Sequence, residues 1–252
     1  MTLNFFKAIA ALVIFLVSLL VAIYPLRTKS LLKQTESFSF GEALASGIFL
    51  GAAAFHMLPD AISTFAAHYG PGAYLIPGTA CLMGLLLLML LEKLSSANAA
   101  KNFSKTIPYF LTLILCVHAL VEGMALGIGN TFSEATLILI ALLAHKGSES
   151  FALSVMLLKH RLALKIILLI ILFFSFMTPL GISFGTFLNQ FTLPHHSSEI
   201  AAALFNAFAA GTFFYIATLH PIHFHKAASH GFLEIVCLIL GVATMGVIAI
   251  WA

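Results

Sequence analysis

Apolar residues occur in eight long runs along this chain, separated by short polar links. The runs cover residues 6–26, 40–66, 73–91, 108–129, 134–158, 164–188, 199–220 and 232–251. Each run is close to the length of about 20 residues that an α-helix needs to cross a bilayer. The short links leave no room for a separate soluble domain. The pattern therefore predicts an all-α polytopic membrane protein, with eight transmembrane helices in a single transmembrane domain over residues 1–252.

The composition supports this interpretation. Hydrophobic residues make up 61% of the 252 residues and charged residues only 8%, and the mean hydropathy is +1.08. These values exclude an ordinary soluble domain and make the lipid bilayer the expected surroundings, with no nucleic-acid partner. The three cysteines all lie in apolar stretches without a C-x-x-C pair, so a thiolate zinc site is not expected.

Ionisable residues interrupt the fourth and fifth apolar runs in a repeated pattern. His118 and Glu122 stand four residues apart in the fourth run, and His145 and Glu149 do so in the fifth. Each residue of the second pair follows its counterpart by 27 positions. The two pairs therefore form a weak internal repeat of one helix.

In an α-helix, residues i and i+4 share one face, so each pair directs an imidazole and a carboxylate to the same place. Two facing helices of this kind supply two nitrogen and two oxygen ligands, which suits Zn²⁺ and similar divalent metals better than Ca²⁺ or Mg²⁺. The alternative is that each side chain is satisfied by a neighbouring helix. Four matching ligand-type residues favour a metal site, because ionisable groups inside a membrane are costly and usually functional.

The positions of the basic residues along the chain predict the topology. Apart from Lys7 and Lys146, all of them lie in or beside the first, third, fifth and seventh links. They are Arg27, Lys29, Lys33, Lys93, Lys101, Lys105, Lys159, Arg161, Lys165 and Lys226. By the positive-inside rule these links are cytoplasmic and both termini lie outside. The fourth and fifth helices are then antiparallel, as in transporters built from inverted repeats with a midplane site.

Five sequence motifs resemble those of the ZIP (Zrt-, Irt-like) family of divalent-metal transporters. The motifs are HALVEG at 118–123, HKGSE at 145–149, HMLPDA at 56–61, SFMTPLG at 175–181 and AAGTFFYIA at 209–217. The resemblance implies an eight-helix bundle with inverted pseudo-symmetry, commonly a homodimer, that moves Zn²⁺ and related metals into the cytoplasm. It also implies that His118, Glu122, His145 and Glu149 form the transport site.

The chain departs from the family pattern at several positions. Val121 and Ser148 stand where many members have proline before the motif glutamate. Ala119 and Lys146 stand where some members place further ligands for a second metal. An ammonium has no lone pair to donate, so Lys146 is expected to replace a second cation and leave a mononuclear site. The alternative is that its side chain extends toward an opening of the transport path.

Other polar residues are candidates for a pathway or for secondary metal binding. His56 and Asp60 are again four residues apart, with Pro59 between them. Ser175 and Asn206 lie in the sixth and seventh runs, where they would support the ligands or simply join helices. The seventh link contains His220, His223 and His225, which suit a cytoplasmic metal exit or a solvated loop with incidental affinity.

The leading hypothesis is zinc uptake across the plasma or inner membrane by a multi-pass transporter that is not an enzyme. Fe²⁺, Cd²⁺, Co²⁺ and Mn²⁺ are compatible with the same ligand set. The alternatives are an intramembrane zinc-dependent hydrolase and a metal-sensing receptor. The string His-Glu-x-x-His, which is typical of zinc proteases, does not occur in the chain. A receptor would be expected to carry a soluble signalling domain.

Overall fold

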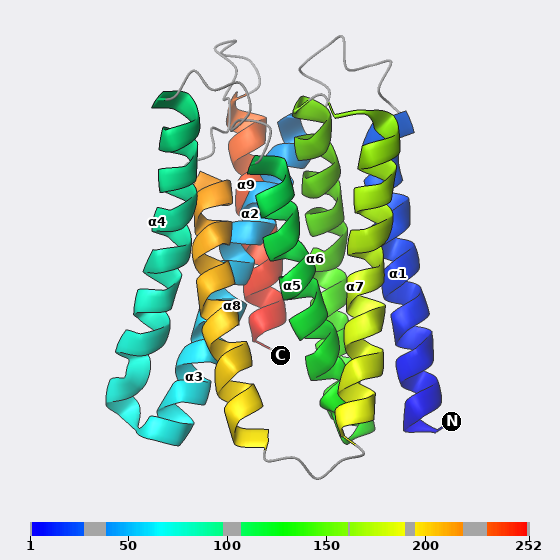
Figure 1. Ribbon diagram of the computed structural model, residues 1–252, viewed down its shortest axis with the longest axis vertical. Coiled ribbons are helices and arrows are strands. Elements are labelled where there is room, and N and C mark those ends of the chain that lie inside the picture. Colours follow the sequence, from blue (N-terminus) through cyan, green and yellow to red (C-terminus); the bar gives the residue numbers. More distant parts are fainter. Residues whose placement is uncertain are drawn as a thin grey trace. The chain divides into compact units, whose positions relative to one another are not determined.

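The computed structural model describes residues 2–27, 39–97, 107–160, 162–189, 195–218 and 231–250. Within these ranges the chain is helical and contains no β-strand (Figure 1). The α-helices are α1 (Leu3–Arg27), α2 (Ser39–Ala52), α3 (Leu58–Tyr69), α4 (Leu75–Ala97), α5 (Ile107–Ile128), α6 (Phe132–Lys159), α7 (Leu164–Leu188), α8 (His195–Thr218) and α9 (Gly231–Ala249). A π-helical segment, η2 (Ala53–Met57), and a 3₁₀ segment, η3 (Pro71–Tyr74), complete them.

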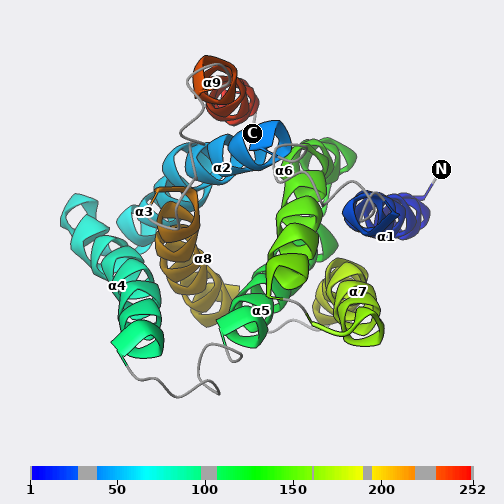
Figure 2. The ribbon, with the colours of Figure 1, turned by 90° about the horizontal axis from the view of Figure 1, so that it is seen from above.

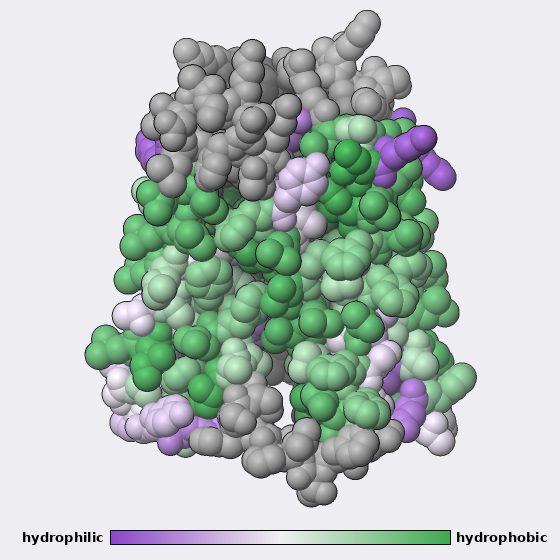
Figure 3. All heavy atoms as spheres, viewed as in Figure 1, coloured by the Kyte–Doolittle hydropathy of each residue, from purple (hydrophilic) through white to green (hydrophobic). Residues whose placement is uncertain are grey.

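Eight of these helical stretches are long and apolar enough to cross a membrane, which confirms the predicted fold class. They are Leu3–Arg27, Phe40–Tyr69, Pro71–Leu91, Pro108–Ile128, Phe132–Leu158, Leu164–Leu188, Glu199–Thr218 and Phe232–Ala249. The face shown in Figure 3 is coloured as hydrophobic over most of its middle height, and hydrophilic residues gather toward its ends. This distribution is the one expected for side chains that contact lipid tails.

The second span is not one regular helix. It consists of α2, the π-helical η2 and α3, with Pro59 in the first turn of α3. Proline has no backbone N–H and its ring clashes with the preceding turn, which favours a local departure from the regular α-helix at this position. The π-helical turn directly precedes the first turn of α3, and it contains His56. Such turns occur frequently at functional sites.

The chain divides into two compact units. The first contains residues 1–30, 108–194 and 250–252, and the second contains 31–107 and 195–249. The first unit is built from α1, α5, α6 and α7, with α7 beside both α1 and α5 (Figure 2). The four predicted metal ligands all belong to this first unit, so the arrangement of the ligands is internal to one compact unit.

Glycines bring α5 and α7 into close contact in the first unit. A Cβ atom at Gly123 would collide with the carbonyl oxygen of Thr178, and one at Gly181 would collide with the backbone of α5. Gly127 and Gly185 repeat this relationship one turn further along each helix. Small residues spaced by four allow helix backbones to approach closely inside a membrane, where van der Waals packing drives association. This packing fixes the segment of α5 that carries the predicted ligands His118 and Glu122.

Helix α1 is tied to the same unit by polar contacts. The buried Lys7 donates from Nζ to the carbonyl oxygen of Gly127, at 2.6 Å, near the end of α5. Ser154 of α6 donates to the carbonyl oxygen of Ala22, at 2.7 Å. A basic group near a helix C-terminus is stabilising because it interacts with otherwise unpaired carbonyl groups.

The second unit is packed in a similar way. A Cβ atom at Gly47 would collide with the backbone of α9, and one at Gly84 would collide with the backbone of α8. The rings of Phe49 and Phe213 lie with their centroids 4.8 Å apart. Close backbone contacts therefore hold α2 to α9 and α4 to α8, so glycines guide the packing in both units.

Candidate metal centre

A tight turn places α6 antiparallel to α5. The helices are separated only by residues 129–131, and Thr131 is the N-cap of α6. Its side-chain oxygen accepts from the backbone N–H of Glu134 at 3.2 Å, while Glu134 Oε2 accepts from the N–H of Asn130 at 3.1 Å. This arrangement resembles a capping box, which satisfies the free N–H groups at a helix start. The chain therefore reverses direction within three residues, and α6 returns alongside α5.

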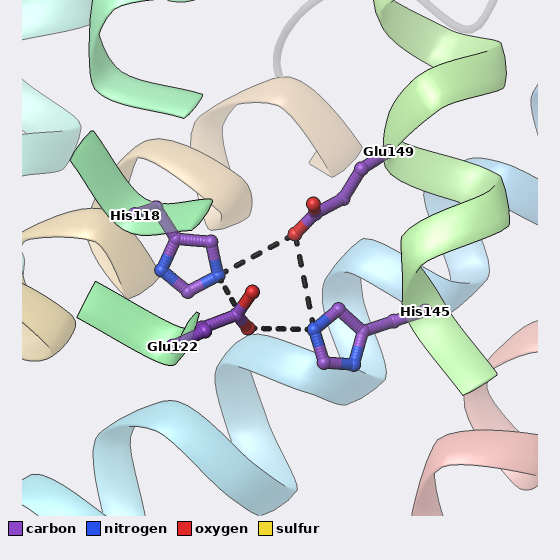
Figure 4. Close-up of side chains that lie close together, drawn as sticks. All are labelled: His118, Glu122, His145 and Glu149. Carbon is purple, nitrogen blue, oxygen red and sulfur yellow. Dashed lines mark hydrogen bonds and ion pairs between the residues drawn. The ribbon is translucent and has the colours of Figure 1, made fainter. Parts of the chain in front are cut away.

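The structure brings all four predicted ligands together (Figure 4). Figure 4 shows His118 and Glu122 extending from α5 toward His145 and Glu149 on α6. Glu122 Oε1 lies 2.9 Å from His118 Nε2 and 2.7 Å from His145 Nε2. Glu149 Oε1 lies 3.4 Å from His118 Nε2 and 3.9 Å from His145 Nε2. One ligand atom from each side chain thus lies within 4.8 Å of all the others.

These distances suit a tetrahedral metal ion. With metal–ligand bonds of zinc length, two ligand atoms of a tetrahedral site lie about 3.4 Å apart. The four distances between a histidine Nε2 and a glutamate Oε1 are 2.7, 2.9, 3.4 and 3.9 Å, so they lie around this value. Glu149 Oε1 accepts no hydrogen bond from the part of the chain that the structure describes. A buried carboxylate oxygen that faces two imidazoles is well placed to bind a cation.

The four side chains are shielded from water. The exposed fractions are 1% for His118, 8% for Glu122, 1% for His145 and 0% for Glu149. Two carboxylates this deeply buried need positive charge nearby, since isolated buried charges are very costly. Among the described residues, this is the one group of three or more His, Cys, Asp or Glu side chains with metal-binding geometry.

Lys146 supplies one positive charge at the cluster. Its Nζ lies 2.9 Å from Glu149 Oε2 and 3.6 Å from Glu122 Oε2, and it sits 4.8 Å from the centroid of the Phe174 ring. The side chain is 0% exposed. Lys146 therefore does not extend to solvent, and it contacts the carboxylate oxygens that point away from the histidines.

The remaining predicted residues belong to other helices or lie outside the described residues. His56 and Asp60 form their own contact in the second unit, with Nδ1 and Oδ2 2.7 Å apart. Ser175 is fully buried on α7, and Asn206 is half-buried on α8. The histidines of the predicted exit loop, His220, His223 and His225, lie outside the described residues.

Two features near the site were not predicted. Phe174, under the Lys146 ammonium, lies in a uniformly apolar run that gives no sign of its role. The close contact at Gly123 did have a signal, because G-x-x-x-G spacing occurs at 123–127 and at 181–185. Gly123 directly follows the predicted ligand Glu122, so the close contact at Gly123 affects the position of the Glu122 carboxylate.

Comparison with known proteins agrees with the geometry. The profile of the family described as ZIP zinc transporter matches residues 4–104 and 98–249. Zinc transporter ZIP1 from Bos taurus is 35% identical over 136 residues, which cover 54% of this chain and 41% of the relative. ZIP1 from Homo sapiens is 34% identical over the same shares. The matched segment thus spans less than half of these relatives.

A plant relative matches over a longer range. Zinc transporter 1 from Oryza sativa subsp. japonica is 25% identical over 274 aligned positions, which cover 87% of this chain and 76% of the relative. The family profile extends over nearly all eight membrane-spanning helices, including both helices that carry the His/Glu cluster. The chain belongs to the ZIP zinc transporter family.

Proposed function

We propose that this protein transports divalent transition-metal ions, with zinc as the first candidate, across a membrane. The observation that carries the proposal is the solvent-excluded cluster of two histidines and two glutamates within two antiparallel membrane-spanning helices. His118, Glu122, His145 and Glu149 bind the ion that is being transported. The relatives are named zinc transporters, which supports zinc as the substrate. Fe²⁺, Cd²⁺, Co²⁺ and Mn²⁺ fit the same ligand types.

The charges at the centre limit how many ions bind. Glu122 and Glu149 contribute two negative charges and Lys146 contributes one positive charge. One divalent ion therefore leaves the cluster with a single net positive charge, and a second ion would meet strong repulsion. Lys146 takes the role of a second cation, so the site is mononuclear. Its repulsion of the bound metal also keeps binding weak enough for release.

Polar groups outside the cluster form the path to and from it. His56 and Asp60 lie on the interrupted second span, where the contact at 2.7 Å pairs a metal-type imidazole with a carboxylate. Ser175 and Asn206 support the ligands or line the path. His220, His223 and His225 receive the ion at the cytoplasmic side. The basic residues in the odd-numbered links support a topology with both termini outside.

The protein acts as a single transmembrane transporter domain over residues 1–252, in the plasma or inner membrane, and forms a homodimer like the family it resembles. A hydrolase is not favoured, since the sequence lacks the His-Glu-x-x-His string of zinc proteases. The ion would be bound by four protein ligands, whereas a catalytic zinc keeps one position open for water.

Metal uptake into proteoliposomes tests the proposal. The wild-type protein should take up zinc, and a panel of divalent ions with an imposed pH gradient would rank substrates and detect proton coupling. His118→Ala and Glu149→Ala should each abolish uptake at equal reconstitution. Thr136→Ala is a matched control on α6, because its hydroxyl bonds to a carbonyl of the same helix at 2.7 Å. Near-normal uptake by both ligand variants would remove the central cluster from the mechanism.

A further inference from the structure

The first helix contacts the two ligand-bearing helices at matching positions of the internal repeat. On α5, the Gly127 carbonyl oxygen accepts from Lys7 Nζ of α1 at 2.6 Å. On α6, Ser154 donates to the Ala22 carbonyl oxygen of α1 at 2.7 Å. Gly127 and Ser154 are 27 positions apart (154 − 127), which is also the offset between the two His/Glu pairs. We propose that through these two contacts α1 fixes α5 against α6 and so determines which divalent ions the cluster prefers, with Lys7 and Ser154 as positioning residues.

The two α1 contacts lie on opposite sides of the His/Glu cluster. Each of them follows the glutamate of its helix by five positions, Gly127 after Glu122 and Ser154 after Glu149. Because α5 and α6 are antiparallel, five positions lead in opposite directions from the cluster. On α1 the two contacts are 15 positions apart (22 − 7), which corresponds to about 22 Å of helix. One helix therefore reaches from one side of the cluster to the other.

The burial of Lys7 indicates a specific role for its contact. Lys7 is in the second turn of α1, and a lysine so close to the end of a membrane-spanning helix ordinarily extends its ammonium to the interface. Lys7 is instead 3% exposed and donates to a residue 120 positions away. The Gly127 oxygen is one of the last four carbonyls of α5, which have no partner within their own helix. The ammonium therefore joins the end of α5 to α1.

The Ser154 hydroxyl is also directed at α1 rather than at its own helix. Serine and threonine inside helices commonly donate to a carbonyl one turn earlier. Thr136 and Ser150 of α6 do so, at 2.7 and 2.9 Å. Ser154 is fully buried and donates to the backbone of α1. This bond joins α6 to α1 on the side of the cluster away from the short turn between α5 and α6.

Apolar packing fixes α1 between its two polar contacts. Ala10 and Ile14 of α1 form a buried cluster with Leu126 of α5, Leu142 of α6 and Ile182 of α7. Along its length α1 packs against α6 and α7 (Figure 2). This packing holds α1 sideways, whereas the hydrogen bonds at its two ends oppose sliding along the helix axes.

The spacing of the ligands depends on how α5 and α6 slide past each other. Within each helix the backbone holds the histidine and the glutamate four positions apart. The distances between the helices, 2.7 Å from Glu122 to His145 and 3.4 Å from His118 to Glu149, change when one helix moves along the other. Geometry, more than intrinsic affinity, sets selectivity among divalent metals. Loss of the α1 contacts should therefore favour Cd²⁺, the larger ion, over Zn²⁺. The inference rests on the proposed function, because it takes the cluster as the metal site.

Metal affinities of the full-length protein in detergent test this inference. Calorimetry gives Kd for Zn²⁺ and Cd²⁺ in the wild type, in Lys7→Met and in Ser154→Ala. Each variant should shift the ratio of the two Kd values toward Cd²⁺ by at least about twofold, as mutations away from a binding site can do. Thr112→Ala is the matched control, since it removes a buried hydroxyl that bonds within α5 at 2.7 Å, and it should keep the wild-type ratio.

A ratio that is unchanged in both α1-contact variants, or equally shifted in the control, would overturn the inference. If Lys7→Met does not fold, Ser154→Ala decides by itself. A wild type that binds neither ion would overturn the proposed function, whereas zinc binding with an unchanged ratio in the variants would overturn the role of α1 alone.

The double variant Lys7→Met with Ser154→Ala separates positioning from general stability. The two contacts are far apart, so their losses in thermal stability should add. The shifts in the ratio should not combine, because release of either end of α1 already frees α5 and α6 to slide. The double variant should therefore show the ratio of the more affected single variant. Shifts that multiply in the double variant would overturn the shared mechanism.

Discussion

Lys146 Nζ donates to Glu149 Oε2 at 2.9 Å, and neither side chain is exposed to solvent. Both residues lie on α6, three positions apart, so the pair forms within one helix. The contact turns one carboxylate oxygen of Glu149 toward Lys146 and leaves the other oxygen facing the histidines. The ammonium therefore orients the proposed metal ligand Glu149 and also balances its charge.

If Lys146 acts as a second cation, Lys146→Asp should raise the metal content. The change removes a positive charge and adds a carboxylate beside Glu149, so zinc binding should tighten or increase from one ion to two per chain. Transport should slow because the bound state is stabilised too strongly. Metal analysis and calorimetry on the purified protein measure these effects. Lys146→Arg keeps the charge and should retain one ion. An unchanged stoichiometry together with unchanged affinity in Lys146→Asp would show that Lys146 is not part of the site.

The Lys146–Glu149 contact should also stabilise the metal-free protein. Among the described residues, Glu149→Gln leaves the buried ammonium with the more distant Glu122 carboxylate, at 3.6 Å, as its remaining ion-pair partner. Breaking a buried ion pair on one side costs about 3–5 kcal/mol, so the variant should unfold at a lower temperature in detergent with chelator present. The double variant Glu149→Gln with Lys146→Met removes both charges and should regain most of the loss. A single variant as stable as the wild type would argue against a structural role for the contact.

Gly123 should not tolerate a side chain. Gly123→Ala places a Cβ against the Thr178 carbonyl oxygen, which forces α5 and α7 apart at the residue that follows Glu122. Overpacking of this kind costs about 1–3 kcal/mol, and a shift of Glu122 should also reduce zinc affinity. Gly78→Ala is the matched control, since a Cβ there meets nothing within 4 Å. Thermal unfolding and zinc binding measure both effects, and equal behaviour of the two variants would contradict the packing argument.

The topology can be checked by labelling single cysteines. In a background without Cys81, Cys116 and Cys237, cysteine at Ser198 should react with an impermeant reagent added outside. Cysteine at Ser96 should react only from the cytoplasmic side, because the basic residues around the third link favour a cytoplasmic location of that link. Labelling of both positions from the same side would refute the eight-span arrangement with both termini outside.

The sequence by itself determined the membrane-spanning segments and the four residues of the cluster. Span lengths follow from bilayer thickness and helix rise, which depend only on local composition. His118 and Glu122 share a face because of helical periodicity, and the 27-residue offset links them to His145 and Glu149. Because only three residues separate α5 from α6, α6 returns alongside α5.

Only the tertiary structure decided which face of each helix packs against its neighbours. The spans are apolar on nearly all sides, so periodicity does not reveal which face of a helix meets a neighbour. Contacts such as Lys7 with Gly127, or His68 with Glu199, join residues more than a hundred positions apart. They depend on the close approach of specific backbones, which the glycines permit and which local sequence does not encode.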